Sequence, residues 1–266
     1  MKEKIRIGAL ISGGGSNLQA IIDACESGKT DGNMVFTGSD NSQANGLKRA
    51  EKHGISRFVV DYAKIINNYK KNPLDSLLPE DFDLEDMRKK QFFFPADYHA
   101  EKADFFLKTR SIAEAALLAE MKSFEFDLLV LAGFMRNLTP YFIDRINTDP
   151  AHPRIMNIHP ALLPAFPGTD GYGDTFRYGC RVGGCTVHFI DYGEDSGPII
   201  GQRAFPIEPA DTLETVKEKG LRQEWILYPE CIQLFAEKRL KTVSATVPAG
   251  EHGKSVTRTI VKILER

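Results

Sequence analysis

Hydrophobic residues in this chain form short runs that alternate with segments in which apolar residues recur every three or four positions. A short apolar run bounded by turn residues is typical of a buried strand, and the longer period is typical of a helix. Regular alternation of the two predicts a mostly parallel α/β sheet with helices on both faces. The predicted strands cover residues 5–11, 34–37, 57–60, 127–132, 154–158, 184–190 and 199–204. The predicted helices cover residues 18–25, 46–53, 111–122, 139–146 and 212–239.

The last predicted helix contains two residues that disfavour helical structure, Gly220 and Pro229. Glycine weakens a helix, so a break can occur at Gly220. Proline lacks the backbone N–H of a helical hydrogen bond, so we expect a kink or a new start at Pro229.

A glycine-rich turn follows the first predicted strand, with Gly13–Gly15 leading into Ser16 and Asn17. Leu18 stands where a dinucleotide-binding GxGxxG pattern would have its last glycine, so that fingerprint is incomplete. Glycines let backbone N–H groups approach an anion, and the start of a helix favours negative charge. The turn therefore suits a phosphate monoester; the alternative is a plain glycine-rich helix start.

Asn157 and His159 lie two residues apart at the end of an apolar run. If the run is a strand, both side chains point the same way, because strand side chains alternate. An amide N–H and an imidazolium can stabilise the oxyanion of a tetrahedral intermediate, which suits acyl transfer. A carboxylate beside the imidazole would raise its pKa and orient the ring, and Asp195 is the candidate. The alternative is a satisfied polar pair at a strand end.

Composition excludes some classes of protein. The chain has 266 residues, 42% of them hydrophobic and 26% charged, with a net charge of −2, so it attracts neither nucleic acid nor an acidic membrane as a whole. The apolar stretch Leu128–Met135 is far shorter than the ~20 residues of a membrane helix. Arg6 interrupts what would be the apolar region of a signal peptide, so we expect no export.

The four cysteines, Cys25, Cys180, Cys185 and Cys231, are too few and too irregularly spaced for a disulfide scaffold, which fits a reducing cytoplasm. Cys180 and Cys185 have only His188 nearby as a further zinc ligand, so we expect no metal site. Buried small hydrophobic residues are the simpler interpretation.

Several motifs occur in a characteristic order: the glycine-rich turn, Ala132-Gly133-Phe134-Met135-Arg136, Asn157-Ile158-His159-Pro160-Ala161-Leu162-Leu163-Pro164, Pro167-Gly168, Thr186-Val187-His188-Phe189 and Asp195-Ser196-Gly197-Pro198-Ile199-Ile200. In this order the chain closely resembles the folate-dependent formyltransferases, and among them the phosphoribosylglycinamide formyltransferases of purine (IMP) synthesis. The resemblance covers roughly residues 4–61 and 105–240. It implies a Rossmann-like formyltransferase fold with an inserted helical segment.

The resemblance also implies a reaction. The amine of glycinamide ribonucleotide attacks the formyl carbon of 10-formyltetrahydrofolate, the co-substrate, and no metal is required. Asn157 and protonated His159 stabilise the oxyanion, while Asp195 holds His159 and helps to relay the amine proton to the leaving N10. No covalent enzyme intermediate is needed, because the amine itself is the nucleophile.

Further site residues follow from the resemblance. In the family the glycine-rich turn binds the phosphate of the ribonucleotide, which corresponds to Gly15, Ser16 and Asn17. The rest of this substrate is expected to bind at Leu221–Glu224, chiefly through Glu224. Folate-binding positions match Met135, Arg136, Asn137, Leu138 and Asn157, the loop Asp191, Tyr192, Gly193 and Glu194 that cups the pterin, and Arg110. We expect Arg110 at the start of a helix, on the folate side, with the phosphate as alternative.

The sequence departs from the family in several places. Asn137 stands where a hydrophobic residue is common. Thr169–Asp174 replaces a histidine-rich stretch, so Asp170 is a candidate for the water-ordering role of those histidines, and Tyr172 takes the place of another. We expect a catalytic domain at 1–240 with an insertion at about 65–105 and a C-terminal extension at 241–266. The insertion contains a helix-like stretch at 79–91 and the run Phe92–Phe94. We expect this run to pack on the main domain or on a partner subunit; a lid over the nucleotide is the alternative.

Other functions remain as alternatives. A formyltetrahydrofolate hydrolase would use the same amide, imidazole and carboxylate with water as nucleophile, but usually carries a regulatory domain before the catalytic one. A methionyl-tRNA formyltransferase would need a tRNA-binding barrel after Leu240. A non-catalytic nucleotide-binding module would give Asn157, His159 and Asp195 no catalytic role. We expect small-molecule substrates, no nucleic acid or membrane partner, and a monomer or homodimer.

Overall fold

The computed structural model describes residues 3–95, 98–248 and 255–265. Seven strands form one sheet in the order β3-β2-β1-β4-β5-β6-β7. The strands are β1 (Ile5–Ile11), β2 (Gly32–Ser39), β3 (Ser56–Val59), β4 (Leu128–Leu131), β5 (Ile155–His159), β6 (Val182–Phe189) and β7 (Ile199–Pro206). The pairs from β3 to β5 are parallel, whereas β5 with β6 and β6 with β7 are antiparallel. The predicted mostly parallel α/β fold is confirmed.

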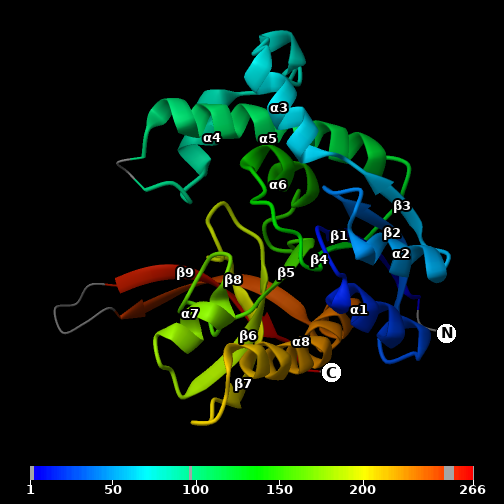
Figure 1. Cartoon of the computed structure of the whole chain (residues 1–266), viewed down its shortest axis with the longest axis vertical. Coiled ribbons are helices and arrows are strands. Elements are labelled where there is room, and N and C mark those ends of the chain that lie inside the picture. Colours follow the sequence, from blue (N-terminus) through cyan, green and yellow to red (C-terminus); the bar gives the residue numbers. More distant parts are fainter. Residues whose placement is uncertain (1–2, 96–97, 249–254, 266) are drawn as a thin grey trace.

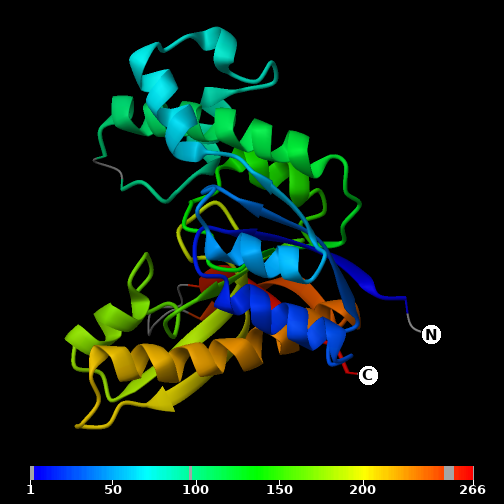
Figure 2. The ribbon, with the colours of Figure 1, turned by 45° about the vertical axis from the view of Figure 1, so that its right-hand side comes forward.

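Helices cover both faces of this sheet (Figures 1 and 2). The helices are α1 (Ser16–Glu26), α2 (Asn45–Lys52), α3 (Tyr62–Lys71), η1 (Asp75–Leu77, a 3₁₀ turn), α4 (Leu84–Lys90), α5 (Ala100–Met121), α6 (Pro140–Ile146), α7 (Gly171–Arg177) and α8 (Leu213–Ala236). One core cluster joins a face of the sheet to α1, α2 and α8. A second cluster joins the opposite face to α5, α6 and Tyr62 at the start of α3. All four residues of β4 are buried, as a central parallel strand covered on both faces requires.

The inserted region forms a helical lobe above the sheet, made of α3, α4 and the first part of α5 (Figure 1). The prediction that a helix starts at Ser111 is wrong, because α5 begins at Ala100 and runs to Met121. The first half of α5 contains many charged residues, so its apolar residues do not show a clear helical period. Leu107 nevertheless packs with Met87 and Tyr141 in a separate small core. The helix-like stretch expected at 79–91 is reduced to α4.

Helix α8 is continuous, so the predicted break at Gly220 and new start at Pro229 are wrong. The ring of Tyr172 lies where a side chain on residue 220 would be, since an added Cβ would come within 2.1 Å of it. Glycine at this position therefore serves packing. Pro229 is buried within the helix, which runs on without interruption to Ala236.

The chain after α8 forms an antiparallel ribbon of β8 (Leu240–Pro248) and β9 (Ser255–Ile263), for which the sequence pattern gave no strands. The Thr242 hydroxyl lies 2.8 Å from the backbone oxygens of Pro150 and Ala151, and thus links the ribbon to the loop before β5. Residues 96–97 of the predicted insertion, and 249–254 and 266 of the predicted extension, lie outside the described residues. The division into these segments stays a prediction.

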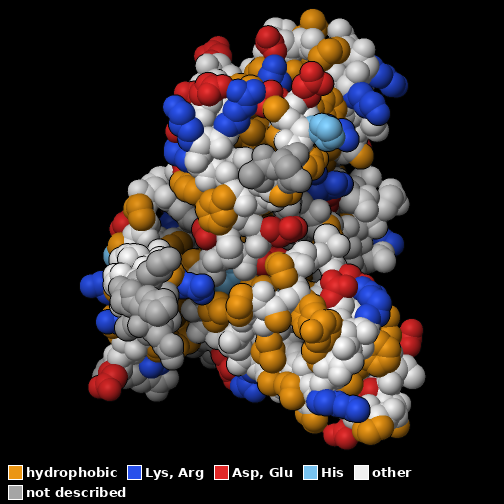
Figure 3. Space-filling model, turned by 90° about the vertical axis from the view of Figure 1, so that its left-hand side faces the viewer, with side chains coloured by type: hydrophobic (Ala, Val, Ile, Leu, Met, Phe, Trp, Pro, Cys, Tyr) orange, Lys and Arg blue, Asp and Glu red, His pale blue; other side chains and the backbone are white. Residues whose placement is uncertain are grey.

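Charged side chains of both signs are mixed on the helical lobe, and hydrophobic side chains gather on the lower half of the face in Figure 3. This face therefore carries no extended patch of one sign. Among the described helices, none is long and apolar enough to cross a membrane.

Candidate active site

A cavity of about 360 Å³ opens at the carboxyl ends of β4 and β5. Open α/β sheets commonly bind ligands at this edge. The loop after β4, the end of β5, the loop after β6 and one side of α8 meet there, so residues far apart in sequence share one wall. The cavity is lined by Asn17, Phe93, Met135, Arg136, Asn137, Leu138, Asn157, His159, Tyr172, Asp191, Gly193, Glu194, Asp195 and Glu224, among others.

Asn157 and His159 both belong to β5 and both line the cavity. The period-two argument from the sequence therefore places the two side chains correctly relative to each other. His159 is almost fully buried, whereas Asn157 is half-buried. The amide is thus the more accessible donor of the two.

His159 is held at both ring nitrogens. Its Nδ1 lies 3.1 Å from Oδ2 of Asp195, and its Nε2 lies 2.8 Å from the backbone oxygen of Phe166. Both partners can only accept hydrogen bonds, so the ring satisfies both as an imidazolium. Burial by itself lowers the pKa of His159, but the hydrogen bond and charge of Asp195 outweigh it and raise the pKa above its usual value.

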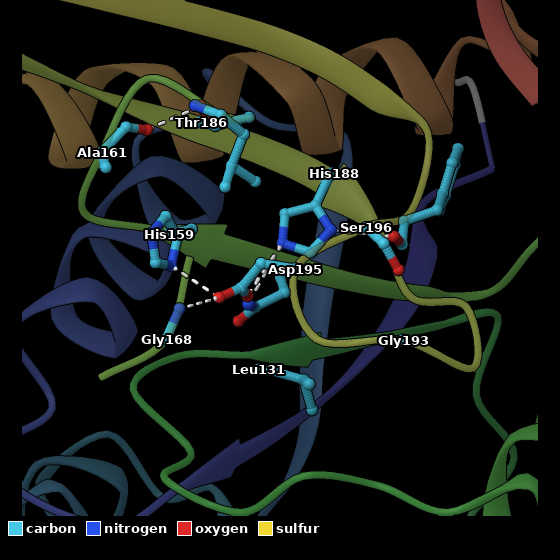
Figure 4. A network of polar contacts seen from close by, with 12 residues as sticks. Leu131, His159, Ala161, Gly168, Thr186, His188, Gly193, Asp195 and Ser196 are labelled. Carbon is cyan, nitrogen blue, oxygen red and sulfur yellow. Dashed lines mark hydrogen bonds and ion pairs between the residues drawn. The ribbon is translucent and has the colours of Figure 1, made fainter. Parts of the chain in front are cut away.

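Asp195 is the acceptor at the centre of this network (Figure 4). Its Oδ2 also accepts the backbone N–H of Gly168 at 2.8 Å. Burial would raise the pKa of this carboxyl, yet the hydrogen bond and charge of His159, the nearby imidazole of His188 and the Gly168 N–H hold it far below its usual range. Asp195 has φ 50°, a left-handed conformation that costs a non-glycine residue about 1–3 kcal/mol. Its surroundings therefore fix the carboxylate in a conformation that the backbone alone disfavours.

His188 is a site residue that the sequence argument missed. It pairs with Asn157 across β5 and β6. Its Nδ1 lies 2.9 Å from the Phe189 oxygen, while its Nε2 lies 3.3 Å from the Asn157 amide nitrogen and 3.6 Å from Oδ1 of Asp195. Figure 4 shows it on the opposite side of Asp195 from His159. The antiparallel register was the signal that could have found it, but no sequence pattern shows that β6 runs antiparallel.

Asn17, Glu224 and Tyr172 form a second network in the same cavity. Oε2 of Glu224 accepts from the Asn17 amide at 2.6 Å, and Oε1 accepts from the Tyr172 hydroxyl at 2.6 Å. Burial raises the pKa of Glu224, against the effect of these two hydrogen bonds. The side-chain oxygen of Asn17 is buried without a hydrogen-bond partner among the described residues. An unpartnered buried acceptor next to a carboxylate suits a ligand that carries hydroxyl groups.

The residues of the glycine-rich turn lie in two different places. Of these residues, only Asn17 lines the active-site cavity, while Ser16 lines a separate groove between α1 and α8. Gly15 has φ 70° at the start of α1, and an added Cβ would lie 2.6 Å from the Cα of Gly46. Gly15 is therefore required by the backbone conformation and by packing, whatever the turn binds.

The predicted folate positions fall mostly along one wall. Met135, Arg136, Asn137 and Leu138 line the cavity, and so do Asp191, Gly193 and Glu194 from the facing loop. Arg136 forms an ion pair with the buried Asp40. Tyr192 belongs to the same loop but does not line the cavity, because its hydroxyl donates to Asp144.

Two candidates lie elsewhere. Arg110 is in the middle of α5, so its expected place at a helix start is wrong, and it does not line the cavity. Its guanidinium carbon lies 4.8 Å from the ring centre of Phe106 and 5.5 Å from that of Tyr62. Asp170, the candidate for the water-ordering role, forms an ion pair with Arg177 at 2.7 Å, and its carboxylate is thus already engaged.

Within the described part of the chain, no group of three or more His, Cys, Asp or Glu residues is arranged to hold a metal ion. All four cysteines are free thiols, and Cys25, Cys185 and Cys231 are buried. Burial raises the pKa of Cys25 to about 11 and that of Cys185 to about 12, so neither is a ready nucleophile.

Comparison with known proteins agrees with this geometry. The formyl transferase family model matches residues 5–232. The phosphoribosylglycinamide formyltransferase of Bacillus subtilis is 32% identical over 222 residues, covering 84% of this chain and 90% of that protein. The crystal structure of glycinamide ribonucleotide transformylase 1 from Symbiobacterium toebii superposes with a TM-score of 0.70 at 34% identity, covering 100% of this chain and 96% of that one.

A human relative, the trifunctional purine biosynthetic protein adenosine-3, is 31% identical over 253 residues. That match covers 95% of this chain, but the chain spans only 20% of the length of the human protein. The family match covers most of the described fold, including the ends of β4 and β5 where the cavity lies. The chain belongs to the formyl transferase family.

Proposed function

We propose that this chain transfers the formyl group of 10-formyltetrahydrofolate to the amine of glycinamide ribonucleotide, a step of purine biosynthesis. The products are formylglycinamide ribonucleotide and tetrahydrofolate. One observation carries the proposal: the amide of Asn157, the imidazole of His159 and the carboxylate of Asp195 share one cavity with the Asn17–Glu224 pair. The relatives from Bacillus subtilis and Symbiobacterium toebii carry names that fit the same reaction.

The two networks suggest where the two substrates bind. Glu224 and Asn17 offer buried acceptors, which suit the hydroxyl groups of a ribose. Met135–Leu138, together with Asp191, Gly193 and Glu194, form a wall of mixed polarity that we assign to the folate. The reacting amine and the formyl carbon would then meet beside Asn157. Holding both reactants in one site in the right orientation can supply much of the rate enhancement of such a transfer.

We assign the oxyanion to Asn157 and His159. An amide carries two N–H groups, so Asn157 can keep its contact with His188 and donate the second to the oxyanion. Both ring nitrogens of His159 have protein partners in this structure. His159 would therefore act through its positive charge unless the contact with Phe166 opens. Charge placed in advance in a buried site stabilises a developing oxyanion strongly.

The proton balance limits the role of Asp195. The attacking nitrogen loses a proton, and N10 of the leaving folate gains one. A carboxylate whose pKa lies far below its usual range is a weak base. We therefore assign Asp195 to holding His159 in its protonated form and orienting it, and give the proton transfer to water in the cavity. This revises the relay role expected from the sequence.

The discriminating experiment measures release of tetrahydrofolate from 10-formyltetrahydrofolate with and without glycinamide ribonucleotide. Transfer requires the ribonucleotide, and formylglycinamide ribonucleotide should accumulate in equal amount. Equal folate release without the ribonucleotide would identify a hydrolase instead. A chain that binds ribonucleotide but turns over neither substrate would be a binding module. We also propose a cytoplasmic location, because free cysteine thiols are typical of proteins in a reducing compartment.

A further inference from the structure

The loop between α4 and α5 reaches the candidate active site through Phe93. This residue lines the same cavity as Gly193 and Glu194, although it belongs to the inserted region outside the motifs of the resemblance. It is half-buried, whereas its neighbour Phe92 is 58% exposed. The inserted region is therefore part of the cavity wall as well as a separate lobe.

Phe92 joins this segment to the loop after β6. Its backbone N–H donates to the backbone oxygen of Tyr192 at 3.2 Å. Its ring occupies the space beside Gly193, where an added Cβ would lie 2.3 Å from Cε2 of Phe92. Glycine at 193 thus allows the ring to approach the loop backbone closely.

A second link ties the end of α4 to the same loop. Lys90 contacts Asp144 on α6 at 2.8 Å, and the Tyr192 hydroxyl donates to the same carboxylate. Burial and this hydrogen bond raise the pKa of Tyr192 to about 12, so the hydroxyl keeps its proton and remains a donor at neutral pH. Two contacts of different chemistry therefore hold the segment in place.

Phe93 is also supported from behind. Its ring centre lies 4.6 Å from that of Phe94 and 5.5 Å from that of Phe106, the latter in an edge-on arrangement. Phe94 in turn stacks on Tyr98 at 4.5 Å. These separations are typical of favourable aromatic pairs. The cluster positions Phe93 at the cavity while Phe94 stays outside its lining.

We propose that Phe93 is a binding residue for the planar aromatic part of the folate co-substrate. The inference rests on the proposed function, since it takes a folate as the ligand of this wall. Phe93 lines the cavity together with Met135–Leu138 and with Asp191, Gly193 and Glu194, and the adjacent Phe92 packs on that last loop. A conjugated ring binds well against an aromatic side chain that is already fixed, because little rotational freedom is lost.

The test compares Phe93→Ala with Phe94→Ala. Both variants remove a phenyl ring from the same cluster, but only the first changes the cavity lining. We expect Phe93→Ala to raise the KM for 10-formyltetrahydrofolate roughly tenfold, with the KM for glycinamide ribonucleotide and kcat nearly unchanged. Phe94→Ala should leave both KM values near wild type. Phe93→Tyr keeps the ring and should restore folate affinity, and Phe93→Leu keeps apolar volume if the alanine variant fails to fold.

The outcomes separate the two claims. If the wild type transfers formyl groups but Phe93→Ala or Phe93→Leu shows a wild-type KM for folate, the inference fails and the proposed function stands. If Phe93→Ala and Phe94→Ala raise both KM values equally, Phe93 only supports the fold and the inference fails. A wild type without transfer activity overturns both.

Discussion

Replacing Asp195 by Asn tests the charge relation at the centre of the site. His159 Nδ1 and Asp195 Oδ2 are 3.1 Å apart, and the two side chains are 3% and 13% exposed. At an effective dielectric constant of about 20, opposite charges at this distance attract by about 5 kcal/mol. Burial of the imidazolium opposes that attraction, so the net stabilisation of the charged ring is smaller.

The Asn side chain keeps the shape but loses the charge. Burial of His159 is then opposed only by the Phe166 hydrogen bond and the charge of Glu224, so the pKa of His159 falls. Less imidazolium is present at neutral pH, and we expect kcat to fall by roughly 10²-fold, as for loss of one oxyanion donor. Part of the loss should return as the pH is lowered, because protonation restores the charge. The assay is kcat against pH for both proteins, with circular dichroism as the control for folding. A variant with the wild-type rate and pH profile would refute the assignment.

The same substitution has a separate signature in stability. The pKa of Asp195 is depressed, so its contribution to the unfolding free energy is present above the unfolded value of about 3.9 and is lost as the pH falls. The pKa of His159 is raised, so its contribution is full below about 6.5 and is lost as the pH rises through the folded value. The variant should therefore lose about 1.5–3 kcal/mol mainly between pH 4 and 6.5. Urea unfolding across this range measures the loss, and a uniform loss at every pH would contradict the ion pair.

Other perturbations address the remaining parts of the site. Asn157→Ala or His159→Ala should reduce kcat by roughly 10²-fold with little change in folate affinity, and near wild-type turnover in either folded variant would contradict the proposed oxyanion site. Gly15→Val should lower the melting temperature as well as ribonucleotide affinity, because its Cβ would meet the backbone of Gly46; an unchanged melting temperature would show that the turn tolerates a side chain. Tyr172→Phe should raise the KM for glycinamide ribonucleotide about tenfold and spare kcat, since it removes one hydrogen bond to a buried carboxylate, and an unchanged KM would show that Glu224 binds ligand without it.

Most of the sheet was predictable because its central strands are buried, as β4 is along its whole length. Predicted and observed strands differ by one or two residues at most of their ends, as expected for patterns that mark burial but not hydrogen bonding. The antiparallel direction of β6 and β7 could not be deduced from composition, because residue types alone do not fix the direction of a strand.

The helices were less predictable where tertiary contacts override local preference. The first half of α5 is charged, yet Leu107 is buried against Met87. Gly220 and Pro229 weaken an isolated helix, but α8 stays intact, because its second half packs on the main core and its first half packs through Val216 on Tyr172 and Phe205. Propensities read from the sequence describe the structure that a segment prefers in isolation. Where this preference conflicts with tertiary packing, burial of the apolar side chains determines the structure.

The catalytic candidates were predictable to the extent that they lie close in sequence. Asn157 and His159 share a strand, so period two suffices to bring them together. Asp195 was the candidate carboxylate for the imidazole, a choice that the family resemblance supported, and the structure shows the contact directly at 3.1 Å. His188 and Phe93 reach the site through strand register and through the inserted region, and the local sequence around each does not show that it lies in the cavity or beside Asp195.

Tyr172 shows how the departures from the family fit together. The sequence suggested Asp170 as the residue that replaces a family histidine, but its carboxylate pairs with Arg177. Tyr172 instead reaches Glu224 across 52 positions of sequence, and its ring fits because residue 220 is glycine. Gly220, which weakens α8 locally, therefore leaves the space that Tyr172 needs to reach the cavity. A larger residue at 220 would displace Tyr172 and remove a hydrogen bond from Glu224, so these three positions should change together or not at all.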